Sequence, residues 1–137
     1  MNLSEEYYTL KGYSLLEGKK VTTAMEDYLE MLYRLNKENK LLRISQVAEY
    51  LHVKPSSASK MISNLKANGF VHFEKYGIIT LTSAGLELGS YLLFRHDILH
   101  RFFCQINHSE NELEQVEKVE HFIDFRTLLH IAELLEK

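Results

Sequence analysis

The sequence predicts a mainly α-helical fold with one small β-hairpin. Apolar residues recur three and four positions apart over most of the 137 residues, which is the spacing of an amphipathic helix. One short stretch, residues 70–82, instead alternates between apolar and polar residues around the tripeptide KYG, as the two strands of a hairpin do. The apolar content of 45% is enough for a real core, in one domain or in two small and closely packed units.

Residues 1–20 are expected to form an N-terminal arm. Apolar side chains between residues 7 and 16 could pack the arm against the rest of its own subunit or against a second subunit. Gly12 and Gly18 argue against a long helix in this segment. The next segment, residues 23–38, has the periodicity of an amphipathic helix. Thr23 and Glu26 are spaced as a capping box at its start.

Two short helices follow, around a three-residue turn. The sequence RISQVAEYL predicts the first helix, capped by Ser45, and HVK forms the turn. Pro55 suits the first position of the second helix, which Asn68 and Gly69 close. Helix, turn, helix and hairpin in this order are the arrangement of a winged helix-turn-helix, which we assign to residues 21–83.

The remaining residues, 84–137, predict a helical region. A long helix over residues 83–106 has a wide apolar face, and Ser109 with Glu112 is expected to begin an acidic helix after it. The last segment, residues 125–137, is again amphipathic. These apolar faces exceed what one small domain needs, so we expect this region to dimerise.

The net charge of −3 is unevenly distributed along the chain. Residues 40–77 hold six basic and two acidic residues, a balance of +4, whereas residues 108–125 hold one basic and six acidic residues, a balance of −5. A basic front half and an acidic rear half indicate two different partners. No stretch approaches the roughly 18 apolar residues of a membrane span, and the single Cys104 agrees with a reducing compartment, so we expect a cytoplasmic protein without a membrane partner.

The basic half has the features of a DNA-reading surface. The start of the second helix of a helix-turn-helix enters the major groove, where short hydroxyl donors approach bases or phosphates and lysines neutralise the backbone. The tip of the hairpin could reach the neighbouring backbone. The candidate DNA-binding residues are Lys54, Pro55, Ser56, Ser57, Ser59, Lys60, Lys75 and Tyr76. For one such helix alone a solvated surface is an equal alternative, but the hairpin that follows favours DNA binding.

Carboxylates and imidazoles gather at helical spacing in three separate segments. The candidates are Asp27, Glu30, His96, Glu117, Glu120 and His121. If the helices pack together, four carboxylates and two imidazoles repel one another unless protons or a cation neutralise them, and Arg95 could pair with one carboxylate. Each residue alone is more often part of a solvated face or of a core. Together they indicate a divalent metal, and an oxygen-rich site without thiolate suits manganese or ferrous iron.

Two further side chains are weaker candidates for this site. Cys104 lies eight residues beyond His96, about 12 Å along a helix, which is too far for the same ion. His100 lies one turn beyond His96 and is a better alternative ligand than the cysteine.

Five segments resemble the manganese-transport regulators of the diphtheria-toxin-repressor family: TTAMEDYLEMLYRL, VAEYLHVKPSSASKMISNL, FEKYGIITLTSAG, RHDIL and VEKVEHF. The resemblance covers residues 22 to about 135. It implies that Asp27 and Glu30, His96 after the wing, and the Glu117-x-x-Glu120-His121 motif bind a pair of metal ions. Similar iron-sensing members place a sulfur ligand where this chain has Asp27.

The resemblance implies a homodimeric transcriptional repressor that manganese activates, with two Mn²⁺ ions in each subunit. Its partner would be a double-stranded DNA operator that is roughly palindromic, as a two-fold dimer requires. An iron-responsive repressor with Fe²⁺ is the alternative. A di-metal carboxylate enzyme is a further alternative, although that chemistry wants two Glu-x-x-His motifs and the sequence has one cluster of another spacing. A metal-independent winged-helix protein with an acidic interaction face is a third.

Overall fold

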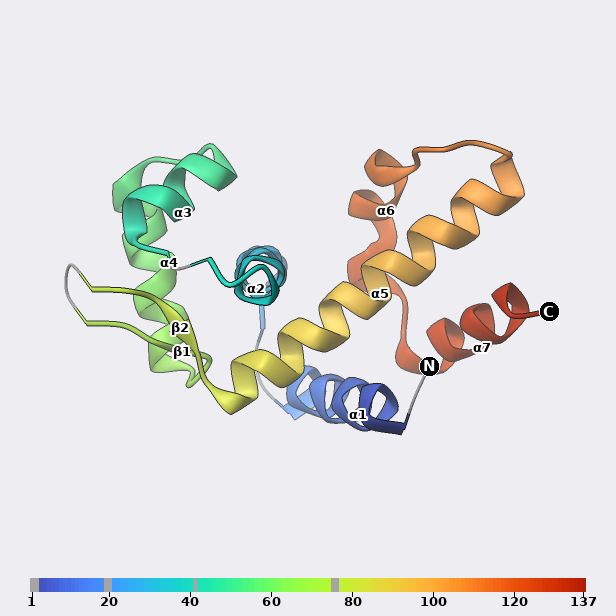
Figure 1. Ribbon diagram of the computed structural model, residues 1–137, viewed down its shortest axis with the longest axis horizontal. Coiled ribbons are helices and arrows are strands. Elements are labelled where there is room, and N and C mark those ends of the chain that lie inside the picture. The colour runs from blue at the N-terminus through green and yellow to red at the C-terminus, as the bar shows by residue number, and fades with distance from the viewer. Residues whose placement is uncertain (1–2, 19–20, 41, 75–76) are drawn as a thin grey trace.

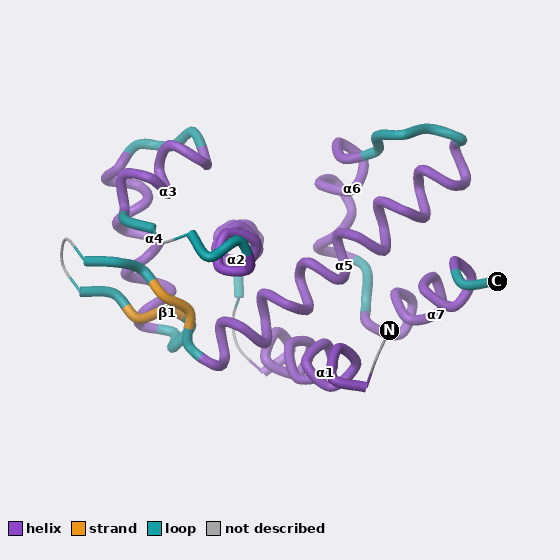
Figure 2. Tube along the Cα trace, in the orientation of Figure 1, coloured by secondary structure: helices purple, strands orange, loops and turns teal. Residues whose placement is uncertain are grey.

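The long helix α5, Ser83–Asn107, runs through the middle of the molecule and joins its two halves (Figure 1). The computed structural model describes the backbone of residues 3–18, 21–40, 42–74 and 77–137, and the side chains from residue 10 onward within these ranges. Helices make up most of the described chain, and a single two-stranded sheet accompanies them (Figure 2). The predicted fold class is therefore confirmed.

The first half of the molecule is a winged helix-turn-helix. It contains α2 (Thr23–Lys37), α3 (Ile44–Leu51), α4 (Pro55–Ala67), β1 (Val71–His72) and β2 (Thr80–Leu81). The two strands are antiparallel, with Val71 opposite Leu81, and a bridge between Leu42 and Ile79 ties the segment before α3 to the hairpin. As predicted, Pro55 begins α4, and Gly69 follows its C-terminus with a φ of 81°.

The helix caps differ from the predicted ones. Thr22, not Thr23, caps α2, because its side-chain oxygen accepts a hydrogen bond from the backbone N–H of Met25 at 3.2 Å. Ser45 does not cap α3, which already begins at Ile44. There the side-chain oxygen of Gln46 accepts a hydrogen bond from the backbone N–H of Arg43 at 2.8 Å.

The second half consists of the end of α5, α6 (Leu113–Val119), the 3₁₀ turn η1 (Glu120–Phe122) and α7 (Phe125–Leu135). The acidic segment does not begin at Ser109, whose hydroxyl donates to the side chain of Glu112 at 2.7 Å instead of capping a helix. It is also broken, because the α-helix ends at Val119 and η1 continues it. This break turns the last residues of the acidic motif toward α2 and α5.

The N-terminal segment forms a sixteen-residue helix, α1 (Leu3–Gly18), that packs along α5 (Figure 1). The expectation that two glycines would prevent a long helix is wrong, since Gly12 serves close packing. A side chain at Gly12 would press on the carbonyl oxygen of Glu87 and on Tyr91. Tyr13, the next residue, lies 5.2 Å from the ring of Phe125 and 5.7 Å from that of Tyr91, measured between centroids, so α1 also contacts α7.

One apolar core extends through both halves. Fully buried side chains in α2, α4 and the wing, such as Leu29, Ile62 and Phe70, belong to one cluster with those of α5, and Val116 and Leu128 continue the core into α6 and α7. A core shared in this way holds the two halves in a defined relation. In the described part of the chain, no helix is both long enough and apolar enough to span a membrane.

Candidate functional site

Three elements bring the predicted metal ligands together. Helix α2 presents Asp27 and Glu30 three residues apart, α5 presents His96, and η1 presents Glu120 and His121. These five residues form two groups whose donor atoms lie within 4.8 Å of one another. Glu120 belongs to both groups, so the two groups are adjacent and share one carboxylate.

The first group consists of Glu30, His96 and Glu120. Nδ1 of His96 lies 3.2 Å from Oε2 of Glu120 and 3.8 Å from Oε2 of Glu30. Both His96 and Glu120 are buried, with 8% and 3% of their surface exposed. Arg34, one turn along α2, donates to Oε2 of Glu30 at 3.1 Å and is a competing cation for this carboxylate.

The second group consists of Asp27, Glu120 and His121. Nε2 of His121 lies 3.6 Å from Oδ1 of Asp27 and 4.0 Å from Oε1 of Glu120. Asp27 is the most exposed of these three, so this group opens toward solvent whereas the first is more enclosed. The two oxygens of Glu120 thus face different groups, which is the geometry of a carboxylate between two cations.

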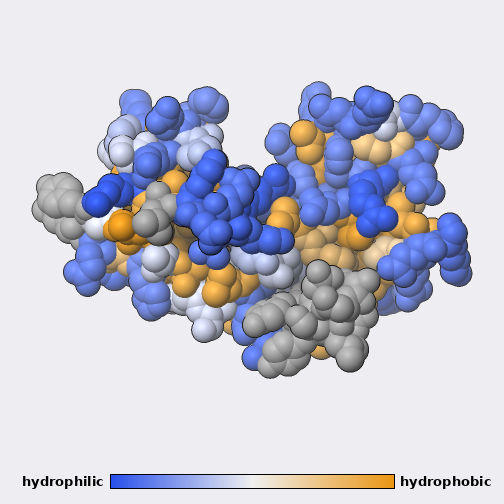
Figure 3. Space-filling view, in the orientation of Figure 1, coloured by the Kyte–Doolittle hydropathy of each residue, from blue (hydrophilic) through white to orange (hydrophobic). Residues whose placement is uncertain are grey.

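Both groups face one cavity of about 560 Å³. Glu117, the sixth predicted ligand, lines the same cavity from α6 but belongs to neither group. The cavity is also lined by Tyr50 and Leu51 of α3, so it lies between the two halves of the molecule, where the space-filling view shows a notch (Figure 3). His100 and Cys104 contact each other at 3.5 Å, and Nε2 of His100 accepts from the backbone N–H of Glu112 at 3.2 Å. Neither residue lines this cavity.

Crowding changes the acidity of these side chains. Burial, reinforced by the charge of Glu120, raises the pKa of Glu30 from 4.5 to about 7. Burial also raises the pKa of Asp27, in spite of the nearby imidazole of His121. The hydrogen bond to Glu120 raises the pKa of His96, although burial opposes this shift. Without a cation, the site therefore favours protons on carboxyl groups.

The spacing of the donor atoms fits hard divalent cations. Donors about 2.1 Å from such an ion lie roughly 3 Å apart when adjacent and roughly 4 Å apart when opposite. The separations of 3.2 and 3.8 Å in the first group, and of 3.6 and 4.0 Å in the second, lie near these values. Carboxylate and imidazole donors without a thiolate suit manganese and ferrous iron, among other divalent ions.

One residue of this site was not predicted from the sequence, and the role of another was predicted only in part. Glu26 was interpreted as a capping residue, but it is buried, and its Oε1 lies 2.8 Å from Nδ1 of His121. Arg95 does pair with a carboxylate, as expected, and the partner is Glu26 at 3.1 Å. These partners are 69 and 95 residues apart in the chain from Glu26, so no local pattern could have indicated them.

The predicted DNA-reading residues of α4 lie on the side of the helix that faces away from the core. Ala58, Ile62 and Leu65 face the core, and the other side of the helix is exposed. The exposed residues of the predicted set are Lys54, Pro55, Ser56, Ser57 and Lys60, and Ser59 is half-buried. Lys75 and Tyr76, the predicted contacts at the tip of the hairpin, lie outside the described residues.

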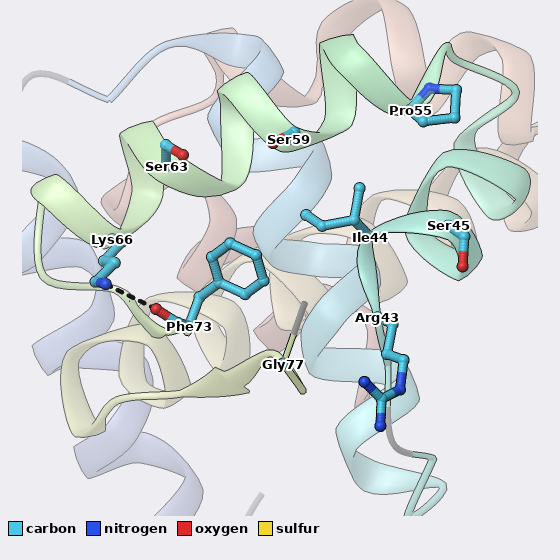
Figure 4. Close-up of a pocket in the computed structure, with 9 residues that line it drawn as sticks. All are labelled: Arg43, Ile44, Ser45, Pro55, Ser59, Ser63, Lys66, Phe73 and Gly77. Atoms are coloured by element: carbon cyan, nitrogen blue, oxygen red, sulfur yellow. Dashed lines mark hydrogen bonds between the residues drawn. The ribbon is translucent and has the colours of Figure 1, made fainter. Parts of the chain in front are cut away.

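A groove of about 760 Å³ lies between α4, the start of α3 and the wing (Figure 4). Pro55, Ser59, Ser63 and Lys66 line it along α4. Nζ of Lys66 donates to the backbone oxygen of Phe73 at 2.7 Å, so the helix is tied to the wing across the groove (Figure 4). Arg43 and Ser63, which the sequence did not predict as DNA-binding residues, also line the groove.

Known proteins resemble this chain in sequence and in fold. Residues 20–79 match the family described as iron dependent repressor, N-terminal DNA binding domain. The HTH-type transcriptional regulator MntR of Oceanobacillus iheyensis is 37% identical over 115 residues, which are 83% of this chain and 78% of that protein. MntR of Bacillus subtilis is 36% identical over 116 residues, which are 84% of this chain and 82% of that protein. The crystal structure of ScaR with bound Zn²⁺ is similar to this chain with a TM-score of 0.69 and 26% sequence identity. The match covers 82% of this chain and 53% of the ScaR chain, so this chain spans about half the length of that structure.

A winged helix-turn-helix joined to a cluster of carboxylates and imidazoles defines a class of protein, the metal-responsive DNA-binding regulators. Within that class, this chain belongs to the manganese-transport-regulator branch of the diphtheria-toxin-repressor family. It is a metal-responsive transcriptional repressor and not an enzyme, which sets aside the di-metal carboxylate enzyme considered above.

Proposed function

We propose that the physiological signal of this repressor is Mn²⁺, bound as two ions in each subunit. The proposed ligands are Asp27, Glu30, His96, Glu117, Glu120 and His121. The observation that carries the proposal is the position of Glu120, which is buried and contributes one oxygen to each group. When bound, divalent ions supply the positive charge that these crowded carboxylates lack.

The ligands tie the DNA-reading half to the rest of the molecule. Asp27 and Glu30 belong to α2, a helix of the winged head, whereas His96, Glu120 and His121 belong to the other half. When metal relieves the repulsion between the carboxylates, these side chains hold α2 against α5 and η1. They then favour one placement of the head, by which we mean the winged helix-turn-helix from α2 to β2. A coupling free energy of about 1–3 kcal/mol, or 5- to 150-fold in operator affinity, is typical of such linkage.

The active form is proposed to be a homodimer that acts on DNA in the cytoplasm. Large apolar side chains are exposed in the second half of the molecule, and Phe122, directly after the proposed ligands, is 82% exposed. Figure 3 shows apolar patches among hydrophilic ones over the half that holds α6 and α7. A two-fold dimer would bind a roughly palindromic operator through α4 of each subunit, with half-sites about one helical turn of DNA, or a multiple of it, apart.

The proposal is tested by measuring operator binding as a function of the metal. Duplexes selected by the protein from a randomised pool in the presence of Mn²⁺ provide the operator, and fluorescence anisotropy then gives the affinity with and without metal. We expect Mn²⁺ to raise the affinity at least several-fold and the selected sites to be palindromic. Equal affinity with and without every divalent metal would instead support the metal-independent winged-helix alternative.

Iron is the second candidate signal, because oxygen and imidazole donors also suit Fe²⁺. The same titration under anaerobic conditions with Mn²⁺, Fe²⁺, Zn²⁺ and Co²⁺ separates the two. Asp27 is the position at which similar iron-sensing relatives place sulfur, so an Asp27→Met variant should respond less to Mn²⁺ relative to Fe²⁺ than the wild type does. An unchanged ratio would show that Asp27 does not determine the preference.

A further inference from the structure

Glu26 occupies a buried position directly behind the proposed metal ligands. Only 5% of its surface is exposed, and a single oxygen, Oε1, contacts two other side chains. Nδ1 of His121 lies 2.8 Å from this oxygen, and Nη2 of Arg95 donates to it at 3.1 Å. No group of potential ligands in the described chain includes Glu26, so it does not face the cations itself.

The two nitrogens of the His121 ring have different partners. Nδ1 faces Glu26, whereas Nε2 faces Asp27 at 3.6 Å, on the side of the proposed ions. Nη2 of Arg95 also lies 3.4 Å from Nδ1, but a guanidinium only donates, so this contact would require Nδ1 to be an acceptor. The bond to Glu26 is much shorter, and a carboxylate can only accept. Nδ1 therefore carries a hydrogen, and in the neutral ring Nε2 keeps a free lone pair.

We propose that Glu26 is a positioning residue, which holds the His121 ring in the tautomer and orientation that present Nε2 to a metal ion, and that Arg95 holds Glu26. The inference rests on the proposed metal site. Ligating imidazoles commonly donate their second N–H to a carboxylate, and removing such a partner typically weakens metal affinity by about 10- to 100-fold. Glu26 and Asp27 are adjacent on α2, so this helix supplies both a ligand and the support of another ligand.

Arg95 makes a buried carboxylate at this place tolerable. Its surface is 1% exposed, its guanidinium lies 5.8 Å from the centre of the Tyr91 ring, and it neutralises Glu26 without entering the cavity of the ligands. A buried carboxylate without a paired cation would be costly at this place. Arg95 thus holds the carboxylate of Glu26 beside Nδ1 of His121.

Single variants at this pair would leave a buried charge without a partner and could fail to fold. The decisive protein is therefore the double variant Glu26→Leu/Arg95→Met, in which apolar side chains of similar size replace both charges. Such replacements are often neutral for stability or even stabilising. We expect the double variant to unfold at a temperature close to that of the wild type, yet to bind Mn²⁺ about 10- to 100-fold more weakly. Wild-type affinity for Mn²⁺ in a folded double variant would overturn the inference.

Two controls separate positioning from charge. Glu26→Gln/Arg95→Met removes both charges but keeps an acceptor oxygen for Nδ1, so it should lose less affinity than the apolar double variant does. Glu114→Gln removes a carboxylate from α6 that pairs with exposed Lys118 and should leave Mn²⁺ affinity nearly unchanged. An equal loss of Mn²⁺ affinity in Glu26→Gln/Arg95→Met and in the apolar double variant would overturn the inference, because an acceptor for Nδ1 would then make no difference.

A metal-free measurement tests the inference independently of the proposed function. In ¹⁵N NMR spectra of the apo protein in alkaline buffer, His121 should show a protonated Nδ1 and an unprotonated Nε2. The double variant should lose this preference. A wild-type His121 with the hydrogen on Nε2 would overturn the inference, whereas a wild type with the expected tautomer that does not bind Mn²⁺ would contradict only the proposed function.

Discussion

Glu30 shows what crowding does to a single carboxyl group. Its pKa is raised to about 7 by burial and by the charge of Glu120, so the folded protein retains a proton that the unfolded chain releases near pH 4.5. Between these two values the folded state binds more protons than the unfolded state does. The contribution of Glu30 to the free energy of unfolding therefore falls as pH rises from about 4.5 to about 7, and stays low above that range.

A pH dependence of both stability and metal binding follows. Mn²⁺ must displace the proton of Glu30 below about pH 7, so its affinity should rise with pH up to about 7 and level off above, with protons released on binding at about pH 6. Calorimetric titration in buffers of different ionisation enthalpy measures that release. In the apo protein, Glu30→Gln should raise the free energy of unfolding by on the order of 2 kcal/mol at about pH 8, and by much less at about pH 5. A stabilisation independent of pH would contradict the raised pKa.

Glu120 is the residue on which both groups depend. Replacing it by glutamine keeps its shape but removes one negative charge and the stronger donor, so Mn²⁺ affinity should fall and the metal-dependent gain in operator affinity should shrink. The apo protein should be as stable as the wild type or more so, because Glu30 loses a like charge. Thermal unfolding with and without Mn²⁺ measures both the stability of the apo protein and the stabilisation that Mn²⁺ adds. A variant that melts earlier without metal, yet gains as much from Mn²⁺, would contradict the metal site.

The same residues show what sequence reasoning could reach. Asp27, Glu30, His96, Glu120 and His121 carry the chemistry of ligands, and the spacing of three residues predicts a common face for Asp27 with Glu30 and for Glu117 with Glu120. Glu26 differs, because its spacing from Thr23 also fits a local cap. Its role depends on Arg95 and His121, which only the packing of α2 against α5 and η1 brings to it.

Helix α1 shows the same contrast at the scale of whole elements. Propensity alone argues against a long helix with two glycines, since each costs up to about 1 kcal/mol relative to alanine. Packing reverses the conclusion, because the missing side chain at Gly12 lets α1 approach the backbone of α5. By contrast, Pro55 and Gly69 determine the conformation of their own backbone, independently of packing. Both ends of α4 were therefore predicted correctly from the sequence.

The two glycines of α1 provide a matched pair of variants. Gly12→Ala should destabilise the protein by roughly 1–3 kcal/mol, because the new methyl group meets the backbone of Glu87 and the side chain of Tyr91. Gly18→Ala has nothing within 4 Å of the new side chain and should be neutral or slightly stabilising. Chemical denaturation compares the two proteins. If Gly12→Ala were as stable as Gly18→Ala, α1 would not be packed on α5 as described.

At the scale of the whole molecule, sensing and reading occupy separate surfaces joined by α2 and α5. The cavity of the proposed ligands is lined by residues of both halves, including Tyr50 and Leu51 of α3, the first helix of the helix-turn-helix. The exposed face of α4 contributes no residue to that cavity. Metal can therefore affect DNA binding by fixing the placement of the head, without contact between the ions and α4, and a change on α4 should leave the sensor intact.

Lys60 tests this separation. It is exposed on α4, next to half-buried Ser59, and Lys60→Ala should weaken operator binding and reduce its salt dependence, because each phosphate contact releases about 0.9 counterion. Its affinity for Mn²⁺ should stay that of the wild type. Lys118→Ala removes the same charge from α6, where the lysine pairs with exposed Glu114, and should alter the salt dependence much less. Operator affinity measured across a range of salt concentrations with saturating Mn²⁺ compares the two. An unchanged slope for Lys60→Ala, or an equal reduction for both variants, would show that α4 does not contact DNA through this lysine.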